Sequence, residues 1–308
     1  MTEVVVDAAR AEWREIPWLR VWRLLHPSRA RLAAMVSLSL AGSAAGLVAP
    51  IALGAVVTAL ERHRSGTALW CASAIACAFA VEAGAYLASD ACYASITADV
   101  LARMRRAMFD GLGPLGPEMR ARFSSRFVSD VETFEELTVG ALDQASMGLF
   151  DLVAALAALA LLDGSLVAVV AGGVAVWIVV VRALRAPVAR AGLRRQEDLE
   201  LMSSQLSSGE GFDEAVARVA AAERRVGRIS AAHRHAGLAL SGVGPAAVVF
   251  AGVLHGVGAG ALLSAYLLST RAFVATDVLF DIKLDVELAR GAVARCFALV
   301  DRAAMLTT

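Results

Sequence analysis

The feature that most constrains this chain is the run from Leu32 to Leu60, which contains no charged residue. About 20 apolar residues in a helix already cross the hydrocarbon core of a bilayer, and this run is longer than that. The whole chain agrees with a membrane environment, because 58% of its residues are hydrophobic and only 19% are charged. We therefore predict an integral membrane protein.

Five further apolar segments follow the first one, and short connections join the six segments in pairs. The segments are Thr67 to Ser89, Ala145 to Leu162, Ser165 to Val181, Ala236 to Leu254 and Gly256 to Thr270. Each pair reads as a helical hairpin, and long polar inserts separate the pairs. These inserts, Asp90 to Gln144 and Arg182 to His235, are each predicted to form two helices joined by a turn. The fold class predicted from this pattern is an all-α membrane protein with six transmembrane helices and two long helical arms.

The predicted organisation has three parts. Residues 1–31 form an interfacial segment, residues 32–290 the transmembrane domain with arms at 90–144 and 182–235, and residues 291–308 a short tail. The first segment contains aromatic residues and leucines that helical spacing places on one side, with arginines interleaved. These residues are Trp13, Trp18, Leu19, Trp22 and Leu25. Such a pattern is typical of an amphipathic helix lying in the membrane interface.

Basic residues are distributed very unevenly between the two predicted sides of the membrane. The segment before Leu32, the two inserts and the stretch from Arg271 onward hold six, six, ten and five Lys and Arg residues, whereas the short connections hold Arg62 and Arg64. The positive-inside rule then predicts cytoplasmic termini and cytoplasmic arms. The basic residues are arginines apart from Lys283, which suggests a genome of high GC content. We expect a multi-pass protein of the bacterial cytoplasmic membrane.

Three charged residues interrupt the apolar segments at similar depths. Glu82, Asp151 and Arg271 lie about 17 to 24 Å from the outer ends of their predicted spans, at about 1.5 Å per residue. An isolated charge at that depth is costly, so such residues are usually paired or face a cavity. Our hypothesis is that Arg271 neutralises Glu82 or Asp151 beside a central cavity. The alternatives are a structural ion pair without substrate contact and a span boundary that is shallower than assumed.

The sequence contains no pattern that predicts catalytic, cofactor-binding or metal-ligating residues. ATP hydrolysis by a P-loop requires G-x-x-x-x-G-K-[ST], which is absent, and the single lysine, Lys283, lies between Asp281 and Asp285. Asp277, Asp281 and Asp285 form one acidic stripe, which we interpret as a solvated helix end. A membrane prenyl-transfer enzyme with a magnesium diphosphate site would need a second such helix. The cysteines and histidines lack metal-site spacing.

Two local sequences carry a family resemblance. Ser125-Arg126-Phe127-Val128-Ser129-Asp130-Val131 matches an S-R-hydrophobic-x-x-D-V stretch that follows the turn of the first arm. The second sequence is Ala292-Val293-Ala294-Arg295-Cys296-Phe297-Ala298-Leu299-Val300-Asp301. It matches the pattern of small residues, Arg, an aromatic residue, Leu and Asp that ends the sixth transmembrane helix in the same family. Together with the predicted topology, they make the chain resemble the transmembrane domain of exporter-type (type IV) ABC transporters.

The resemblance implies a permease subunit that dimerises with itself or with a related transmembrane subunit and couples to a separate ABC ATPase subunit. ATP and magnesium would then bind to that partner, so this chain would not itself be an enzyme. The coupling regions would include Pro117, Glu118, Arg120 and Phe123 in the first arm, and Glu210, Phe212 and Glu214 in the second.

The chain departs from the family pattern in both arms. A Thr-Gly pair is replaced within Met119 to Arg122, and a glutamate is absent around Gln205. An alternative function is therefore a binding, self-resistance or scaffold protein with the same fold but without ATPase coupling, and a third is an integral membrane enzyme. The formal net charge of zero gives no reason to expect a nucleic-acid partner, and the lipid bilayer is the expected surrounding.

Overall fold

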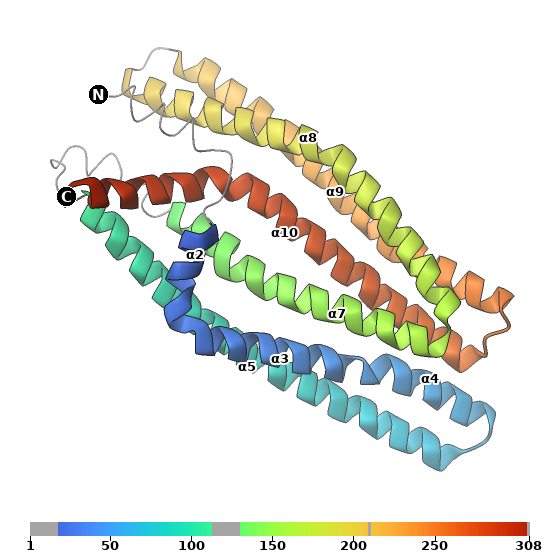
Figure 1. Ribbon diagram of the computed structural model, residues 1–308. Helices are drawn as coiled ribbons and strands as arrows, with labels where there is room; N and C mark the ends of the chain where they lie inside the picture. The colour runs from blue at the N-terminus through green and yellow to red at the C-terminus, as the bar shows by residue number, and fades with distance from the viewer. Residues whose placement is uncertain (1–17, 113–129, 209–210, 307–308) are drawn as a thin grey trace. The chain divides into compact units, whose positions relative to one another are not determined.

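The computed structural model describes residues 18–112, 130–208 and 211–306, and its regular elements in these residues are helices (Figure 1). The α-helices are α2 (Trp18–Leu25), α3 (Arg29–Gly46), α4 (Val48–Glu61), α5 (Ser65–Leu112), α7 (Ala141–Leu162), α8 (Gly164–Ser208), α9 (Phe212–Leu254) and α10 (Ala259–Leu306). A 3-10 turn (His26–Ser28) and a π-helix (Glu136–Gly140) accompany them. The predicted all-α fold is confirmed for the described residues.

Five helical stretches in the described residues are long and apolar enough to cross a membrane. They are Leu19–Glu61, Ser65–Asp110, Asp130–Leu162, His235–Leu254 and Ala259–Ile282. The remaining predicted span corresponds to a shorter apolar stretch at the start of α8, Gly164–Val180. By helix length and hydropathy the chain is a multi-pass membrane protein.

Short connections join the helices that the sequence pairs as hairpins. Residues 62–64 link α4 to α5, and Asp163 links α7 to α8. The connection from α9 to α10 is longer than predicted, since α10 begins at Ala259 rather than at Gly256. Gly256 has a φ of 71°, which lies outside the helical region and is readily adopted only by glycine. The sixth predicted segment therefore begins as a turn.

The first apolar run is divided into two helices at Leu47, where the sequence predicts one continuous span. Leu47 lies between the end of α3 and the start of α4. Pro50 explains the break, because it lacks the backbone N–H that would bond to the carbonyl of Gly46. The carbonyl of Pro50 itself accepts a hydrogen bond from the hydroxyl of Ser264 in α10 at 2.9 Å.

Several helices continue without a break from an apolar segment into a predicted polar arm. The helix α8 has 45 residues and α9 has 43, and at 1.5 Å per residue each is about 65 Å long, roughly twice the thickness of a hydrocarbon core. The two helices lie side by side and antiparallel (Figure 1). After α8 ends at Ser208, Gly211 precedes α9 with a φ of 69°.

The chain folds into two compact units. The first contains the described residues of Met1–Ala49, Ala74–Asp151 and Asp281–Thr308. Its core joins α2, α3, α5, the helical residues 130–140 and the end of α10, and the rings of Phe134 and Phe297 meet edge to face at 5.9 Å. The buried residues are Val21, Leu25, Leu32, Met35, Ile96, Val100, Met104, Met108, Val131, Phe134, Leu137, Val139, Val293, Cys296 and Phe297.

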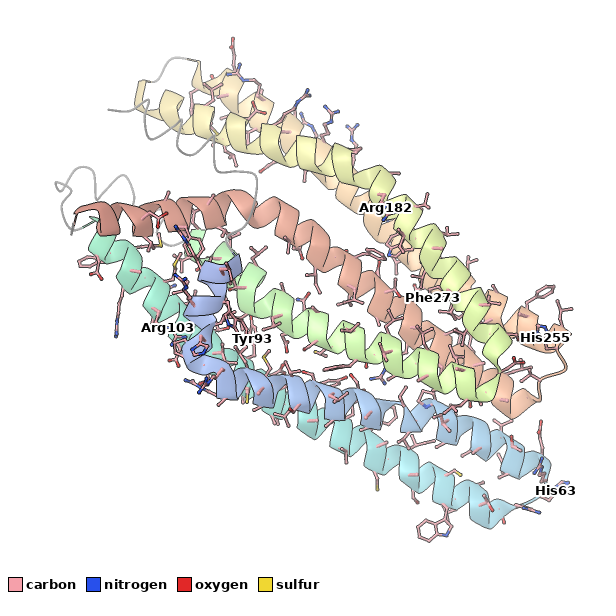
Figure 2. The ribbon with its side chains drawn as sticks, in the orientation of Figure 1. His63, Tyr93, Arg103, Arg182, His255 and Phe273 are labelled. Atoms are coloured by element: carbon pink, nitrogen blue, oxygen red, sulfur yellow. The ribbon has the colours of Figure 1, made fainter. Side chains whose placement is uncertain are left out.

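The second unit contains Pro50–Ser73 and the described residues of Leu152–Phe280. Phe273 of α10 lies between α8 and α9, and its ring occupies the space that a Cβ on Gly173 or Gly244 would need (Figure 2). Two turns further along α10, the ring of Phe280 meets that of Trp177 of α8 edge to face, with the ring centres 6.1 Å apart. Phe273 and Trp177 are both almost fully buried. Aromatic side chains therefore join α10 to the α8–α9 pair.

Candidate functional site

The three predicted intramembrane charges all lie in helical stretches apolar enough to span a bilayer. Glu82 is in α5, Asp151 in α7 and Arg271 in α10. Each side chain is half-buried, and each has an interaction partner. Glu82 and Asp151 belong to the first unit and Arg271 to the second. Pairing of Arg271 with either acid stays a prediction.

The three aspartates of the acidic stripe on α10 differ in how far they are exposed. Asp281 and Asp285 are exposed, as the sequence interpretation expects. Asp277 is half-buried instead, and its carboxylate lies against Gly237 of α9, where an added Cβ would clash with both carboxylate oxygens. The interpretation of one solvated stripe is wrong for Asp277, because the side of α10 that carries Phe273 also carries Asp277 one turn later and packs on α9.

The second predicted coupling region lies at the turn between α8 and α9. Phe212 is the first residue of α9 and is half-buried, whereas Glu214 is exposed in the first turn of the helix. A carboxylate in the first turn interacts favourably with the positive end of the helix dipole. Pro117, Glu118, Arg120, Phe123 and Glu210 lie outside the described residues, as does most of the matched stretch from Ser125 to Val131.

The N-terminal helix α2 is amphipathic, but its buried side differs from the predicted one. Val21 and Leu25 are buried in the core of the first unit, whereas Leu19 and Trp22 are exposed at 78% and 53%. Because Val21 and Leu25 are four residues apart, they share one side of the helix. Leu25 therefore faces inward, away from Leu19 and Trp22. Trp13 and the side chain of Trp18 lie outside the described part of the chain.

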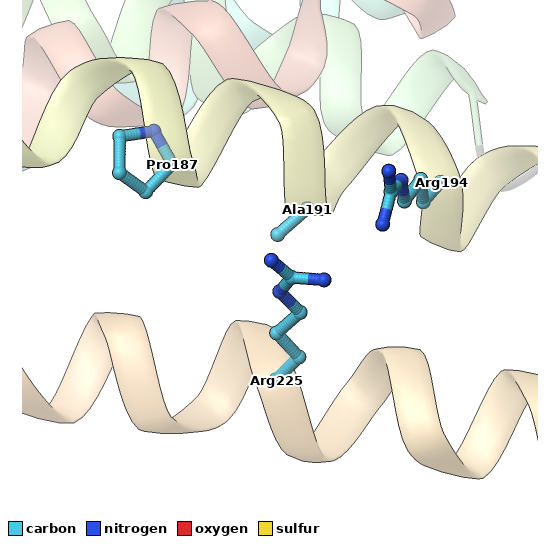
Figure 3. A pocket seen from close by; sticks show the side chains of 4 residues that line it. All are labelled: Pro187, Ala191, Arg194 and Arg225. Atoms are coloured by element: carbon cyan, nitrogen blue, oxygen red, sulfur yellow. The ribbon is translucent and has the colours of Figure 1, made fainter.

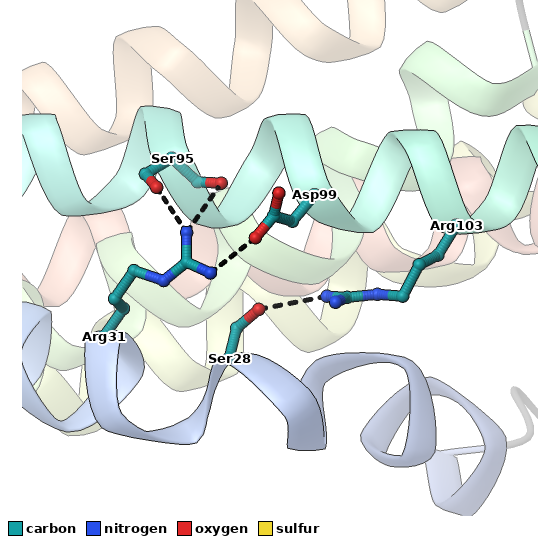
Figure 4. Close-up of polar contacts among 5 residues, drawn as sticks. All are labelled: Ser28, Arg31, Ser95, Asp99 and Arg103. Carbon is teal, nitrogen blue, oxygen red and sulfur yellow. Dashed lines mark hydrogen bonds and ion pairs between the residues drawn. The ribbon is translucent and has the colours of Figure 1, made fainter.

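Polar contacts connect the beginning of α3 to α5 (Figure 4). Arg31 donates hydrogen bonds to the hydroxyl and carbonyl oxygens of Ser95, and it pairs with Asp99 at 2.5 Å. Arg103 donates a hydrogen bond to the hydroxyl of Ser28 at 3.0 Å. Ser95, Asp99 and Arg103 recur every four residues, so one polar side of α5 faces the N-terminal segment. That spacing is visible in the sequence, although our sequence interpretation did not use it.

A second contact connects α2 to the end of α10. Arg20 pairs with Asp301, and its guanidinium group lies 6.0 Å from the centre of the Phe297 ring. This distance is compatible with a cation–π interaction. The helical end of α10 is thereby attached to the N-terminal helix within the first unit.

Comparison with known proteins identifies no family. No protein-family model matches the chain, and no curated protein matches it. The arrangement of its own helices and side chains is therefore the basis for a functional proposal.

Proposed function

We propose that the chain is the transmembrane subunit of an exporter-type ABC system that forms the translocation path and couples to a separately encoded ATPase. The observation that carries this proposal is the α8–α9 pair. Its helices continue from apolar segments into polar arms and reverse near Gly211, with Phe212 and Glu214 at the turn. Such continuous helices transmit a displacement at the turn to the apolar segments, because a packed helix is a stiff element.

In the proposed mechanism, an ATPase subunit binds the cytoplasmic turn between α8 and α9. Nucleotide binding and hydrolysis on that partner displace the arm, and the translocation path opens alternately to the two sides of the membrane. Phe273 supports this proposal, since it lies between Gly173 of α8 and Gly244 of α9 and so joins α10 to both arm helices. A dimer of this chain, or a pair with a related subunit, encloses the path.

Crosslinking from the arm turn tests the proposal directly. The Glu214→Cys variant, in a background without the four natural cysteines, places a thiol at an exposed position of the turn. The matched control is Gly258→Cys, which is exposed in the connection between α9 and α10, at the other end of α9. Crosslinking in native membranes should capture an ATPase subunit from position 214 and not from position 258.

An ATPase that is captured equally from both positions, or from neither, contradicts coupling through this turn. In that case a purified complex that is complete without an ATPase favours the scaffold function. Glu214→Lys should also reduce copurification of the ATPase, because it reverses a charge at the proposed contact. Arg218→Ala, which alters an exposed residue one turn further along α9, should not.

The intramembrane charges provide a second test, of the path itself. We propose that Arg271 faces the translocation path, so Arg271→Ala should reduce cargo-stimulated ATPase activity of the reconstituted complex while Arg271→Lys retains most of it. Copurification of the ATPase should be the same for both variants. Unchanged stimulation in Arg271→Ala would assign this residue a structural role only.

A further inference from the structure

A small cavity lies between α8 and α9 in the part of the two helices beyond their apolar segments (Figure 3). Its volume is about 150 Å³, and Pro187, Ala191, Arg194 and Arg225 line it. Arg225 extends from α9 toward Ala191 on α8, and Arg194 belongs to the next turn of α8 (Figure 3). Two guanidinium groups from facing helices thus border one cavity.

The sequence of α8 explains why space is left between the two helices. Pro187 lies inside α8, where it cannot donate the hydrogen bond that the helix requires, and proline at such a position bends a helix or widens its turn. One turn later, Ala191 is buried and presents only a methyl group. These two small side chains leave room for the long side chain of Arg225.

The charges around the cavity favour an anion. Among the side chains that the structure describes, two arginines and no carboxylate line the cavity, and Asp198 and Glu223, the acids nearest in sequence whose side chains are described, are not among the lining residues. Guanidinium groups bind phosphate through paired hydrogen bonds, and two of them from different helices can hold one phosphate between them. We propose that this cavity binds the phosphate group of a small soluble anion.

The size and position of the cavity define the class of ligand. A cavity of about 150 Å³ is far larger than a single water needs and has room for a phosphate group. Arg194 lies roughly four turns beyond Val180, the end of the apolar stretch, or about 20 Å along the helix. The headgroup layer of a bilayer is only about 5 to 8 Å thick, so a soluble phosphate is favoured over a lipid headgroup.

The test is a titration of the full chain in phosphatidylcholine nanodiscs with inorganic phosphate, followed by phosphorus NMR line broadening. Wild-type protein should show saturable binding, and Arg225→Ala and Arg194→Ala should each weaken it by about ten-fold or more. Arg225→Lys should retain part of the affinity, since it keeps the charge but not the paired donors. Arg218→Ala is the matched control, because it removes an exposed arginine of α9 that does not line the cavity.

Absence of saturable binding, or equal weakening by Arg218→Ala, would overturn the proposal. A second experiment repeats the phosphate titration with phosphatidic acid added to the nanodiscs. Phosphate binding that is unaffected by this lipid supports a soluble ligand, whereas competition by the lipid assigns the cavity to a headgroup and overturns the soluble assignment. Because the chain is tested without an ATPase, failure here is separate from failure of the proposed transport function.

Discussion

Arg20 and Asp301 lie 281 positions apart in the sequence, yet one guanidinium nitrogen of Arg20 donates hydrogen bonds to both carboxylate oxygens of Asp301, at 2.7 and 2.6 Å. The pair joins α2 to the last turns of α10. Both side chains are partly exposed, so water and salt screen the interaction. Its contribution to stability is therefore modest beside that of Val293, Cys296 and Phe297, which bury the same end of α10 in the core of the first unit.

We predict that Arg20→Ala and Asp301→Ala each destabilise the first unit by about 1 kcal/mol or less, as expected for an exposed ion pair. The double variant should cost less than the sum of the two, because each single variant already removes the pair. Unfolding of the protein in mixed detergent micelles measures the three free energies. Strict additivity would show that the two residues do not interact.

A second prediction concerns the contact of α4 with α10. A Cβ on Gly54 would clash with the backbone carbonyl of Gly260, and a Cβ on Gly260 would clash with the carbonyl of Gly54. Backbone atoms cannot rotate away, so the helices must separate. Gly54→Ala and Gly260→Ala should each lower stability by about 1 to 3 kcal/mol, measured by the same unfolding assay.

The control for this crossing is Gly172→Ala in α8, where an added Cβ meets nothing within 4 Å. Alanine is the better helix former by about 1 kcal/mol in water, so this variant should be neutral or stabilising. If Gly260→Ala leaves the free energy of unfolding as unchanged as Gly172→Ala does, α4 and α10 do not approach each other as closely as described.

A third prediction concerns Phe273. Gly244→Ala should be strongly destabilising, because the added methyl group overlaps the ring of Phe273. Phe273→Ala should cost about 3 kcal/mol by leaving a cavity between α8, α9 and α10. In the double variant the added methyl group has room where the ring was. The loss of unfolding free energy in the double variant should therefore be well below the sum of the losses in the two single variants. Independent, additive effects would contradict the placement of Phe273.

Asp163 provides a prediction for pH dependence. The hydroxyl of Ser165 and then its backbone N–H, which bonds to Asp163 at 2.8 Å, lower the pKa of this carboxyl below its ordinary value of 3.8. A carboxyl with a lowered pKa in the folded state stabilises that state above pH 3.8, and this contribution is lost as the pH falls through the lower, folded pKa.

An NMR titration of the Asp163 carboxyl in the micelle-bound protein measures this pKa. Ser165→Ala should raise this pKa part of the way toward the ordinary value, because it removes the hydroxyl beside the carboxylate and keeps the backbone N–H that donates to it at 2.8 Å. Ser95→Ala is the control, because Ser95 lies in the first unit and contacts Arg31 instead. A pKa at or above 3.8 in the natural protein would refute the interaction.

Much of the fold could be predicted because it depends on local patterns. An apolar run as long as Leu32 to Leu60 requires a membrane, and in lipid the backbone must satisfy its own hydrogen bonds, which makes a helix the expected structure. The ends of the apolar segments predicted connections at Glu61–Gly66 and at Asp163–Gly164, and the structure has connections within these ranges, at residues 62–64 and at Asp163. The effect of Pro50 on the first span was equally local, yet our sequence interpretation overlooked it.

The candidate sites could be predicted only in part. Charges within apolar helices are visible in a sequence, so Glu82, Asp151 and Arg271 were found, but the residues they meet depend on how helices pack. The cavity between α8 and α9 was missed for the same reason. Pro187 signals a local distortion, whereas the approach of Arg225 depends on the alignment of two helices whose facing residues are far apart in the sequence.

The sequence by itself determined that this chain is helical, that it belongs in a membrane and that it turns back at short polar connections, because hydropathy and backbone chemistry act over a few neighbouring residues. Only the tertiary structure decided that Val21 rather than Trp22 faces the core, that Asp277 packs on Gly237 and that Arg20 meets Asp301. Such contacts depend on the rotation and crossing of distant helices, which are settled by mutual packing and not by any local pattern.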